Sequence, residues 1–127
     1  MKKILLIVTL FLGYSASAQI KTPSPSPLAS ISQEIGLSNI LLSYSRPAIN
    51  GRKIFGNLVP FGKIWRTGAN ECTKLTLADD LEINGRLVKA GTYALFTIPG
   101  EKNWEVKLNT DTKQWGAYDY DPKKDVV

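Results

Sequence analysis

Apolar and polar residues alternate along most of the chain with a period of two residues. The alternation is clearest at 31–35, 40–44, 75–77, 81–83, 93–98 and 104–108. A strand with one buried face has this period, and no stretch of eleven or more residues beyond the N-terminal segment shows the apolar stripe of a capped helix. The pattern predicts an all-β protein with a single domain, built as an antiparallel β-sandwich or a partly closed barrel.

The dipeptide Asn84-Gly85 predicts a tight hairpin turn. Both residues tolerate left-handed backbone conformations, and they separate two short apolar-polar runs. The strands that flank a two-residue turn have a fixed register. The predicted cross-strand pairs are Ile83 with Arg86 and Leu81 with Val88.

Three further expectations concern burial and the end of the chain. Leu41 interrupts the alternation of its strand, which predicts that this strand is buried on both faces. Trp104 alternates with Val106, which predicts that Trp104 belongs to the core. The last three residues, 125–127, resemble a strand that is just beginning, so we expect that C-terminal strands are missing from the fold.

The first eighteen residues have the layout of a secretory signal peptide. Lys2 and Lys3 precede the apolar run 4–12, and the small residues 16–18 form a cleavage site before Gln19. The alternative is a membrane anchor, but a spanning helix needs about 20 apolar residues. We expect export to the periplasm or the extracellular space, a proline- and serine-rich spacer at 19–29, a β-sandwich domain at 30–127, and no transmembrane segment in the mature chain.

Charge and cysteine content narrow the choice of partners. The formal net charge of +5 includes the two signal lysines, so the mature chain has 14 basic and 11 acidic side chains, a net charge of +3. This mild excess and the predicted export argue against a nucleic-acid partner. Cys72 is the single cysteine and cannot form an internal disulfide. We expect it to be buried, because a reactive thiol would need a base and the chain has no histidine.

The segment from Tyr44 to Thr73 has no sustained period, and loops of this length in small domains usually have a function. One interpretation is a binding site for an anionic or sugar-like ligand, formed by Arg46, Arg52, Trp65, Arg66, Asn70 and Glu71. The structural alternative is that Arg66 pairs with Glu71, the aromatic residues form a satellite core beneath the loop, and Asn70 caps a turn.

Catalytic chemistry has few candidates in this sequence. Without histidine, acid-base catalysis would fall to carboxylates such as Glu71, Asp79 and Asp80, in the manner of a glycosidase. The pair Asp79-Asp80 is also typical of a turn between strands. The sequence therefore favours a protein without catalytic activity and leaves a carboxylate-dependent hydrolase as an alternative.

Metal and cofactor sites have equally little support. One cysteine and no histidine cannot supply the usual ligands of zinc. Asp119, Asp121 and Asp125 carry oxygen ligands for calcium, but the glycine of a helix-loop-helix calcium site is absent. We expect no metal and no cofactor.

Tryptophan placement suggests one class of ligand. Trp65 and Trp115 lie close to glycines and are candidates for surface positions, where an indole ring can stack on a sugar. Burial of the ring is the alternative for both residues.

Several long motifs of the chain resemble a known family. The motifs are YSRP, GRKIFG, LVPFGKIWRTGANE, AGTYALFTIP and WGAYDYD. Together they resemble an exported bacterial family called domain of unknown function 2911, found chiefly in Bacteroidetes-type bacteria, over about residues 30–125. The resemblance implies export and a β-rich fold, and it implies a longer C-terminal end than this chain has. It implies no activity, substrate or catalytic residue.

Three classes of function remain open at this point. They are a binding module for an unknown small molecule, a structural domain or one that binds a protein partner, and an enzyme. The arginine-rich loop favours the first class.

Overall fold

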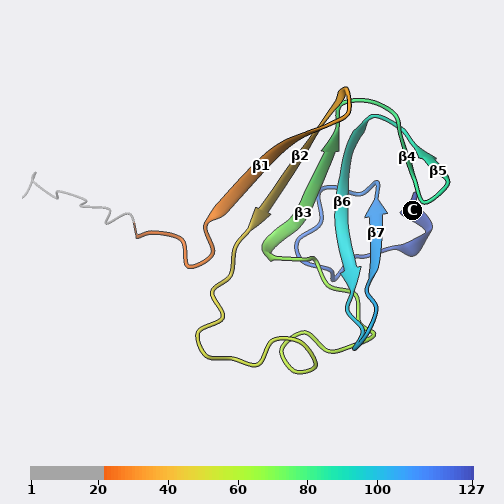
Figure 1. Ribbon diagram of the computed structural model, residues 1–127. Helices are drawn as coiled ribbons and strands as arrows, with labels where there is room; N and C mark the ends of the chain where they lie inside the picture. Colours follow the sequence, from red (N-terminus) through yellow and green to blue (C-terminus); the bar gives the residue numbers. More distant parts are fainter. Residues whose placement is uncertain (1–21) are drawn as a thin grey trace, which may run out of the picture.

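The computed structural model describes residues 22–127 (Figure 1), so the predicted signal peptide and residues 19–21 lie outside the described residues. Seven strands and a short 3-10 helix, η1, follow one another along the described part of the chain. They are β1 (Leu28–Ile35), β2 (Ser38–Ser45), β3 (Ala69–Leu77), β4 (Leu81–Ile83), β5 (Arg86–Val88), β6 (Gly91–Ile98), β7 (Glu105–Asn109) and η1 (Pro122–Lys124).

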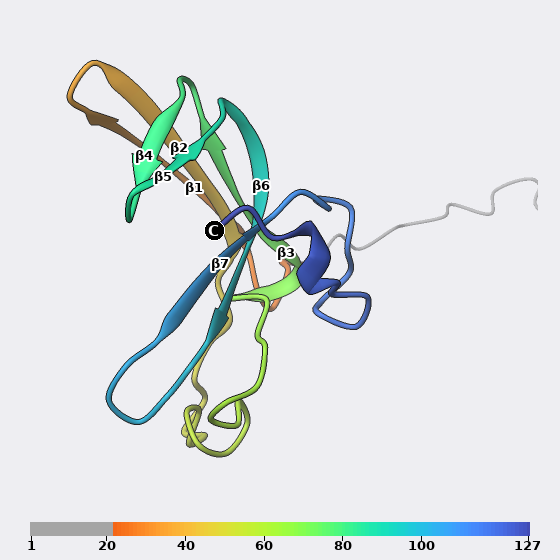
Figure 2. The ribbon, with the colours of Figure 1, turned by 90° about the vertical axis from the view of Figure 1, so that its right-hand side faces the viewer.

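Five of these strands form one antiparallel sheet in the order β1-β2-β3-β6-β7. Strands β4 and β5 form a separate two-stranded sheet that lies to one side of the large one (Figure 2). The prediction of an all-β antiparallel fold is confirmed. The large sheet is open and does not close into a barrel, and the second layer is only a hairpin.

The predicted hairpin is present with the predicted register. Ile83 pairs with Arg86 and Leu81 pairs with Val88. Asn84 and Gly85 have φ angles of 50° and 77°, which is the left-handed region that this type of turn requires.

The hairpin covers part of one face of the large sheet. Val88 of β5 packs in a cluster with Leu77, Tyr93 and Leu108 from β3, β6 and β7. Residues 126 and 127 pack against the same cluster. This face holds the larger of the two cores.

The opposite face has a smaller core of Cys72, Ala94 and Phe96. The irregular segment after β7 covers it, and the ring of Tyr120 meets Phe96 edge-on, with centroids 5.1 Å apart. The prediction that Cys72 is buried is confirmed, and burial raises the pKa of its thiol. The thiol therefore stays protonated at neutral pH, which opposes a role as a nucleophile.

A polar network holds the C-terminal segment against β7. Asn109 is fully buried, and its amide donates hydrogen bonds to the Asp121 carbonyl at 2.9 Å and to Asp125 Oδ1 at 2.7 Å. The Tyr120 hydroxyl donates to Asp125 Oδ2 at 2.5 Å. Within residues 22–127, no three acidic or cysteine side chains gather as a metal site would require. The three aspartates considered for calcium therefore do not form a common site.

Two burial predictions are wrong. Leu41 is 39% exposed, because the face of β2 that carries it is only partly covered. Trp104 is 44% exposed, because β7 begins one residue later and places the indole at the open end of the sheet.

The proline-serine run at 22–27 lies outside the sheet, and β1 begins at Leu28, within the range expected for the spacer. The Pro27 carbonyl accepts a hydrogen bond of 2.9 Å from the Arg46 amide, so the end of the run is tied to the start of the long loop. None of the helices in the described part of the chain has the length and apolar character needed to cross a membrane.

Candidate functional site

The long loop at 46–68 is attached to the sheet by backbone hydrogen bonds. Trp65 and Thr97 of β6 exchange two such bonds, of 2.8 and 2.9 Å, and the Gly62 amide donates to the Pro99 carbonyl at 2.8 Å. The hydroxyls of Thr67 and Thr97 add a side-chain bond of 3.0 Å. The irregular sequence therefore forms a fixed structure, which extends from the end of the sheet (Figure 1).

A tight turn inside the loop brings Ile54 and Val59 together. The Val59 amide donates to the Ile54 carbonyl at 2.9 Å, and the Gly56 amide donates to the Val59 carbonyl at the same distance. Gly56 has a φ of 78°, and a side chain there would meet the Phe61 ring at 2.7 Å. The turn therefore requires glycine at this position, both for its conformation and for its space.

Three aromatic rings pack together where the loop meets the end of the sheet. Phe55 lies edge-on to Trp104 and to Trp65, with centroid distances of 4.8 and 5.8 Å, and the two indoles are 6.3 Å apart. The structural interpretation of the loop expected a satellite core of loop aromatics, and the observed cluster joins two of them to Trp104, which precedes β7. Its rings are only partly covered, so they also offer an aromatic surface.

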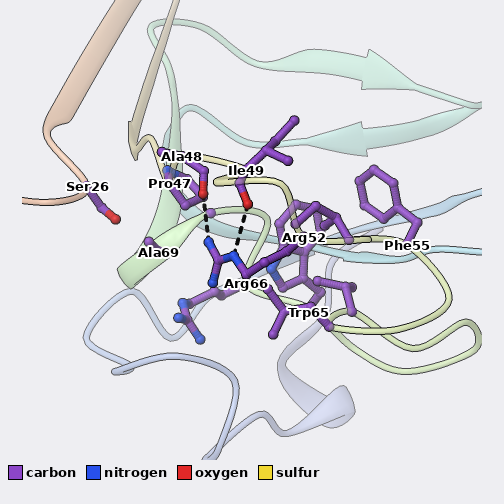
Figure 3. Close-up of a pocket in the computed structure, with 13 residues that line it drawn as sticks. Ser26, Pro47, Ala48, Ile49, Arg52, Phe55, Trp65, Arg66 and Ala69 are labelled. Atoms are coloured by element: carbon purple, nitrogen blue, oxygen red, sulfur yellow. Dashed lines mark hydrogen bonds between the residues drawn. The ribbon is translucent and has the colours of Figure 1, made fainter.

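The loop and the start of β3 enclose a cleft of about 580 Å³, within the size range of small-molecule sites (Figure 3). Its lining is mainly apolar and includes two arginines and no acidic residue. The lining residues are Ser26, Pro47, Ala48, Ile49, Arg52, Ile54, Phe55, Leu58, Val59, Trp65, Arg66, Gly68 and Ala69.

Arg52 shapes the cleft by bonding to its own loop. Its Nη2 donates to the Ala48 carbonyl at 2.6 Å and its Nε donates to the Ile49 carbonyl at 3.0 Å (Figure 3). These bonds close the turn at Asn50-Gly51, where both residues have left-handed φ angles. Arg52 therefore stabilises the loop conformation in addition to carrying a positive charge.

The side chain of Arg66 forms no comparable hydrogen bonds within residues 22–127. Its Nε is buried, and within residues 22–127 no atom accepts a hydrogen bond from it. Its Nη1 lies close to Gly116, where an added Cβ would be 3.5 Å away. A buried donor without a protein partner is costly, and such groups in native proteins commonly bond to ordered water.

The structure separates the six predicted site residues into three groups. Arg52, Trp65 and Arg66 line the cleft. Asn70 and Glu71 line a different hollow, of about 390 Å³, and Arg46 lines neither of the two. The structure therefore does not gather these six residues into one hollow, and their role in binding stays a prediction.

The pair expected between Arg66 and Glu71 is absent among the described residues. Glu71 instead pairs with Lys74, with Oε2 and Nζ 3.2 Å apart. The Asn70 side-chain amide donates to the Ser26 carbonyl at 3.4 Å, which ties the start of β3 to the proline-serine run.

Sequence reasoning missed most of the apolar wall of the cleft. The missed residues are Ile49, Ile54, Leu58, Val59 and Ala69. The sequence did contain a signal for them, since all five are apolar residues in or next to an irregular, glycine-rich stretch. Apolar residues gathered at a surface usually mark a site that contacts a ligand or a partner.

The carboxylates considered for catalysis lie outside the cleft. Asp80 accepts hydrogen bonds from Lys89 Nζ and from the Ala90 amide, both at 2.8 Å. The bond from Lys89 is the main cause that lowers the pKa of Asp80. A general acid at neutral pH needs a raised pKa, so the shift of Asp80 has the wrong direction for that role.

Comparison with known proteins places the chain in a family. Residues 26–127 match the family described as "Protein of unknown function (DUF2911)". The search of curated proteins and the search of solved structures gave no match. The match covers the whole sheet and both core clusters. The chain therefore belongs to the DUF2911 family.

Proposed function

We propose that this domain binds a small organic anion with an apolar or flat body, in the cleft formed by the long loop and β3. The observation that carries the proposal is the mainly apolar lining of that cleft, which includes two arginines and no carboxylate. A carboxylate or phosphate of the ligand would accept hydrogen bonds from a guanidinium at the surface of the cleft, and charge-assisted bonds of this kind are about twice as strong as neutral ones.

The charges around the cleft support an anionic ligand. Neither Arg52 nor Arg66 forms a salt bridge with any residue in the described range. The lining contains no carboxylate that would neutralise them. A ligand anion would meet two guanidinium groups in a partly apolar setting, where electrostatic attraction is stronger than in open water.

The apolar lining supports a ligand with a hydrophobic body. Phe55 and Trp65 provide ring surfaces, and Ile49 and Leu58 provide aliphatic surface. Burial of apolar area contributes about 25 cal/mol per Å². An inorganic anion would leave this apolar surface without a contact, so the proposed ligand has both an anionic group and an apolar body.

Thermal denaturation with matched probes tests the proposal. Benzoate has the charge and the ring, acetate has the charge alone, and benzamide has the ring without the charge. We expect benzoate to raise the melting midpoint more than either of the others, because a ligand at a hundred times its dissociation constant adds about 2.7 kcal/mol of stability.

Arg66→Met is the decisive variant, because it keeps the apolar stem and removes the guanidinium. Arg46→Met is the matched control, since Arg46 does not line the cleft. The shift by benzoate should vanish in the first variant and persist in the second. Equal shifts by benzoate and benzamide, or a shift that survives Arg66→Met, would contradict the proposal.

We also propose that the protein acts after export, in the periplasm or outside the cell. The layout of residues 1–18 supports this, and Cys72 is buried and free, so the described domain needs no disulfide in that compartment. Expression of the full chain in a bacterium, fractionation, and N-terminal sequencing test it. Cleavage before Gln19 is the expected result, and an intact cytoplasmic chain would contradict it.

A second candidate function is pairing with another copy of the chain along β1. This strand is at the outer edge of the sheet, contains no proline or lysine, and exposes Ile31 and Ile35 by 50% and 55%. Unprotected edges of this kind favour strand pairing. In an antiparallel pair centred on β1, Glu34 of each copy faces the beginning of the other strand, so the two charges stay apart.

Light scattering at increasing protein concentration tests this pairing. A dimer that Ile31→Lys converts to a monomer would support it. A monomer at every concentration would exclude it without affecting the proposed cleft.

A further inference from the structure

The pairing of β2 with β3 contains a large irregularity. Ser43 pairs with Lys74 and Ser45 pairs with Ala69, so the single residue Tyr44 on β2 faces the four residues 70–73 on β3. Asn70 adopts a left-handed φ of 59° at the start of this bulge. Bulges of this kind often occur next to functional sites, because they redirect side chains that a regular ladder would fix.

The bulge opens the hollow of about 390 Å³, which is separate from the cleft. Glu71 forms an isolated antiparallel bridge with Trp115, which brings the segment after β7 alongside the bulge. The residues that line the hollow are Leu28, Ser43, Tyr44, Ser45, Asn70, Glu71, Cys72, Lys74 and Trp115. The two strands and the later segment thus build one concave surface.

The hollow combines an exposed aromatic ring with several hydrogen-bonding groups. Trp115 is 60% exposed, although an indole of this size is usually buried on folding. Beside it lie the carboxylate of Glu71 and the ammonium of Lys74, whose charges compensate each other at 3.2 Å. Donors and acceptors are therefore both present, with no net charge between these two residues.

This chemistry distinguishes the hollow from the cleft. The cleft presents two positive charges, which favour an anion. The hollow offers a flat apolar ring for stacking and polar groups around it, which matches a molecule with an apolar ring face and hydroxyls at its edge. A neutral sugar has both of these features.

We propose that the hollow at the β2–β3 bulge is a binding site for a neutral sugar, whose ring stacks on Trp115 and whose hydroxyls bond to Glu71 and Lys74. The inference does not depend on anion binding in the cleft, because the two sites share no lining residue.

Calorimetry and NMR with cellotriose, maltotriose and xylotriose test the proposal. The protein has three tryptophans, so its spectrum has few indole N–H signals, and Trp115→Phe assigns the one that matters. We expect at least one of the three sugars to bind and to shift the indole signal of Trp115. Trp115→Ala should weaken that binding about tenfold, as expected for the loss of an aromatic contact.

Matched controls separate this site from general effects. Glu71→Gln should weaken binding about tenfold, because a hydrogen bond to a carboxylate becomes a weaker one to a neutral amide. Glu105→Gln should leave binding unchanged, since the Glu105–Lys107 pair has nearly the same exposure (65% and 30%, against 66% and 36%) but lies outside the hollow. Tyr118→Ala, an exposed aromatic of the same segment, should also have no effect.

Two results would overturn the proposal. One is the absence of binding by all three sugars at tens of millimolar. The other is binding that Trp115→Ala and Glu71→Gln leave intact, which would place the sugar elsewhere on the protein. The melting midpoint of each variant shows whether it is folded, and these exposed substitutions should lower it little.

Discussion

Replacement of each of three arginines by methionine should change the free energy of unfolding by a different amount. The substitution keeps an unbranched apolar stem and removes the guanidinium. Arg66 has a buried Nε for which no described atom is an acceptor. Such an unsatisfied group costs about 1–3 kcal/mol. Arg66→Met should therefore leave the ligand-free protein as stable as before or stabilise it by about 1 kcal/mol.

The other two arginines have different surroundings. Arg52 donates two hydrogen bonds to carbonyls of its own loop, at 2.6 and 3.0 Å. Each bond contributes about 0.5–1.5 kcal/mol, and solvent exposure reduces the total, so Arg52→Met should destabilise by about 1 kcal/mol. Arg46 is exposed and lines neither site. Arg46→Met should stay within about 0.5 kcal/mol of the parent protein.

Urea and thermal unfolding of the four proteins measure these differences. For a domain of this size, 1 kcal/mol corresponds to a shift of about 4–8 °C in the melting midpoint. The result that would refute the reasoning is a loss of stability in Arg66→Met equal to that in Arg52→Met. Arg66 would then be part of the scaffold, and its charge would not be available to a ligand.

Three other substitutions, two of them with a matched control, test the fold itself. Phe96 is fully buried in the smaller core, so Phe96→Ala should lower the free energy of unfolding, measured in urea, by about 3–5 kcal/mol. Leu87 is exposed, and Leu87→Ala should leave that free energy nearly unchanged. Gly56→Ala should lower the melting midpoint more than Gly36→Ala, because both have left-handed φ angles but only Gly56 faces a ring at 2.7 Å; equal losses would contradict this. Burial and the bond to Asp125 raise the pKa of Tyr120 above its ordinary value of 10.0. The stabilising contribution of Tyr120 is therefore complete at pH values below 10.0 and declines as the pH rises further. In urea unfolding at a series of alkaline pH values, Tyr120→Phe should make the free energy of unfolding fall less steeply with pH. An unchanged dependence on pH would contradict the role of Tyr120.

Local signals made much of the sheet predictable. The left-handed tolerance of Asn84 and Gly85 determined a turn, and the turn determined the register of β4 and β5. Cys72 was placed correctly in the core, because an unpaired cysteine behaves as a small apolar residue.

Features that depend on distant segments were not predictable from local patterns. Trp104 has the alternation of a core residue, but its exposure depends on how much of the sheet end the loop covers. The separation of the predicted site residues into two hollows also depends on distant segments. Glu71 follows Arg66 closely in sequence, but the bulge in β3 directs it toward Trp115, and nothing in the local pattern marks that bulge.

The bonds that attach the long loop to β6 also have a consequence for folding. Thr67 and Thr97, which bond to each other, are 30 residues apart in sequence. Closing a contact over this separation costs chain entropy, so we expect the loop to become ordered together with β6 and not before it. Amide hydrogen exchange at Trp65 and Thr97 should report one shared opening event, in which loop and strand separate together.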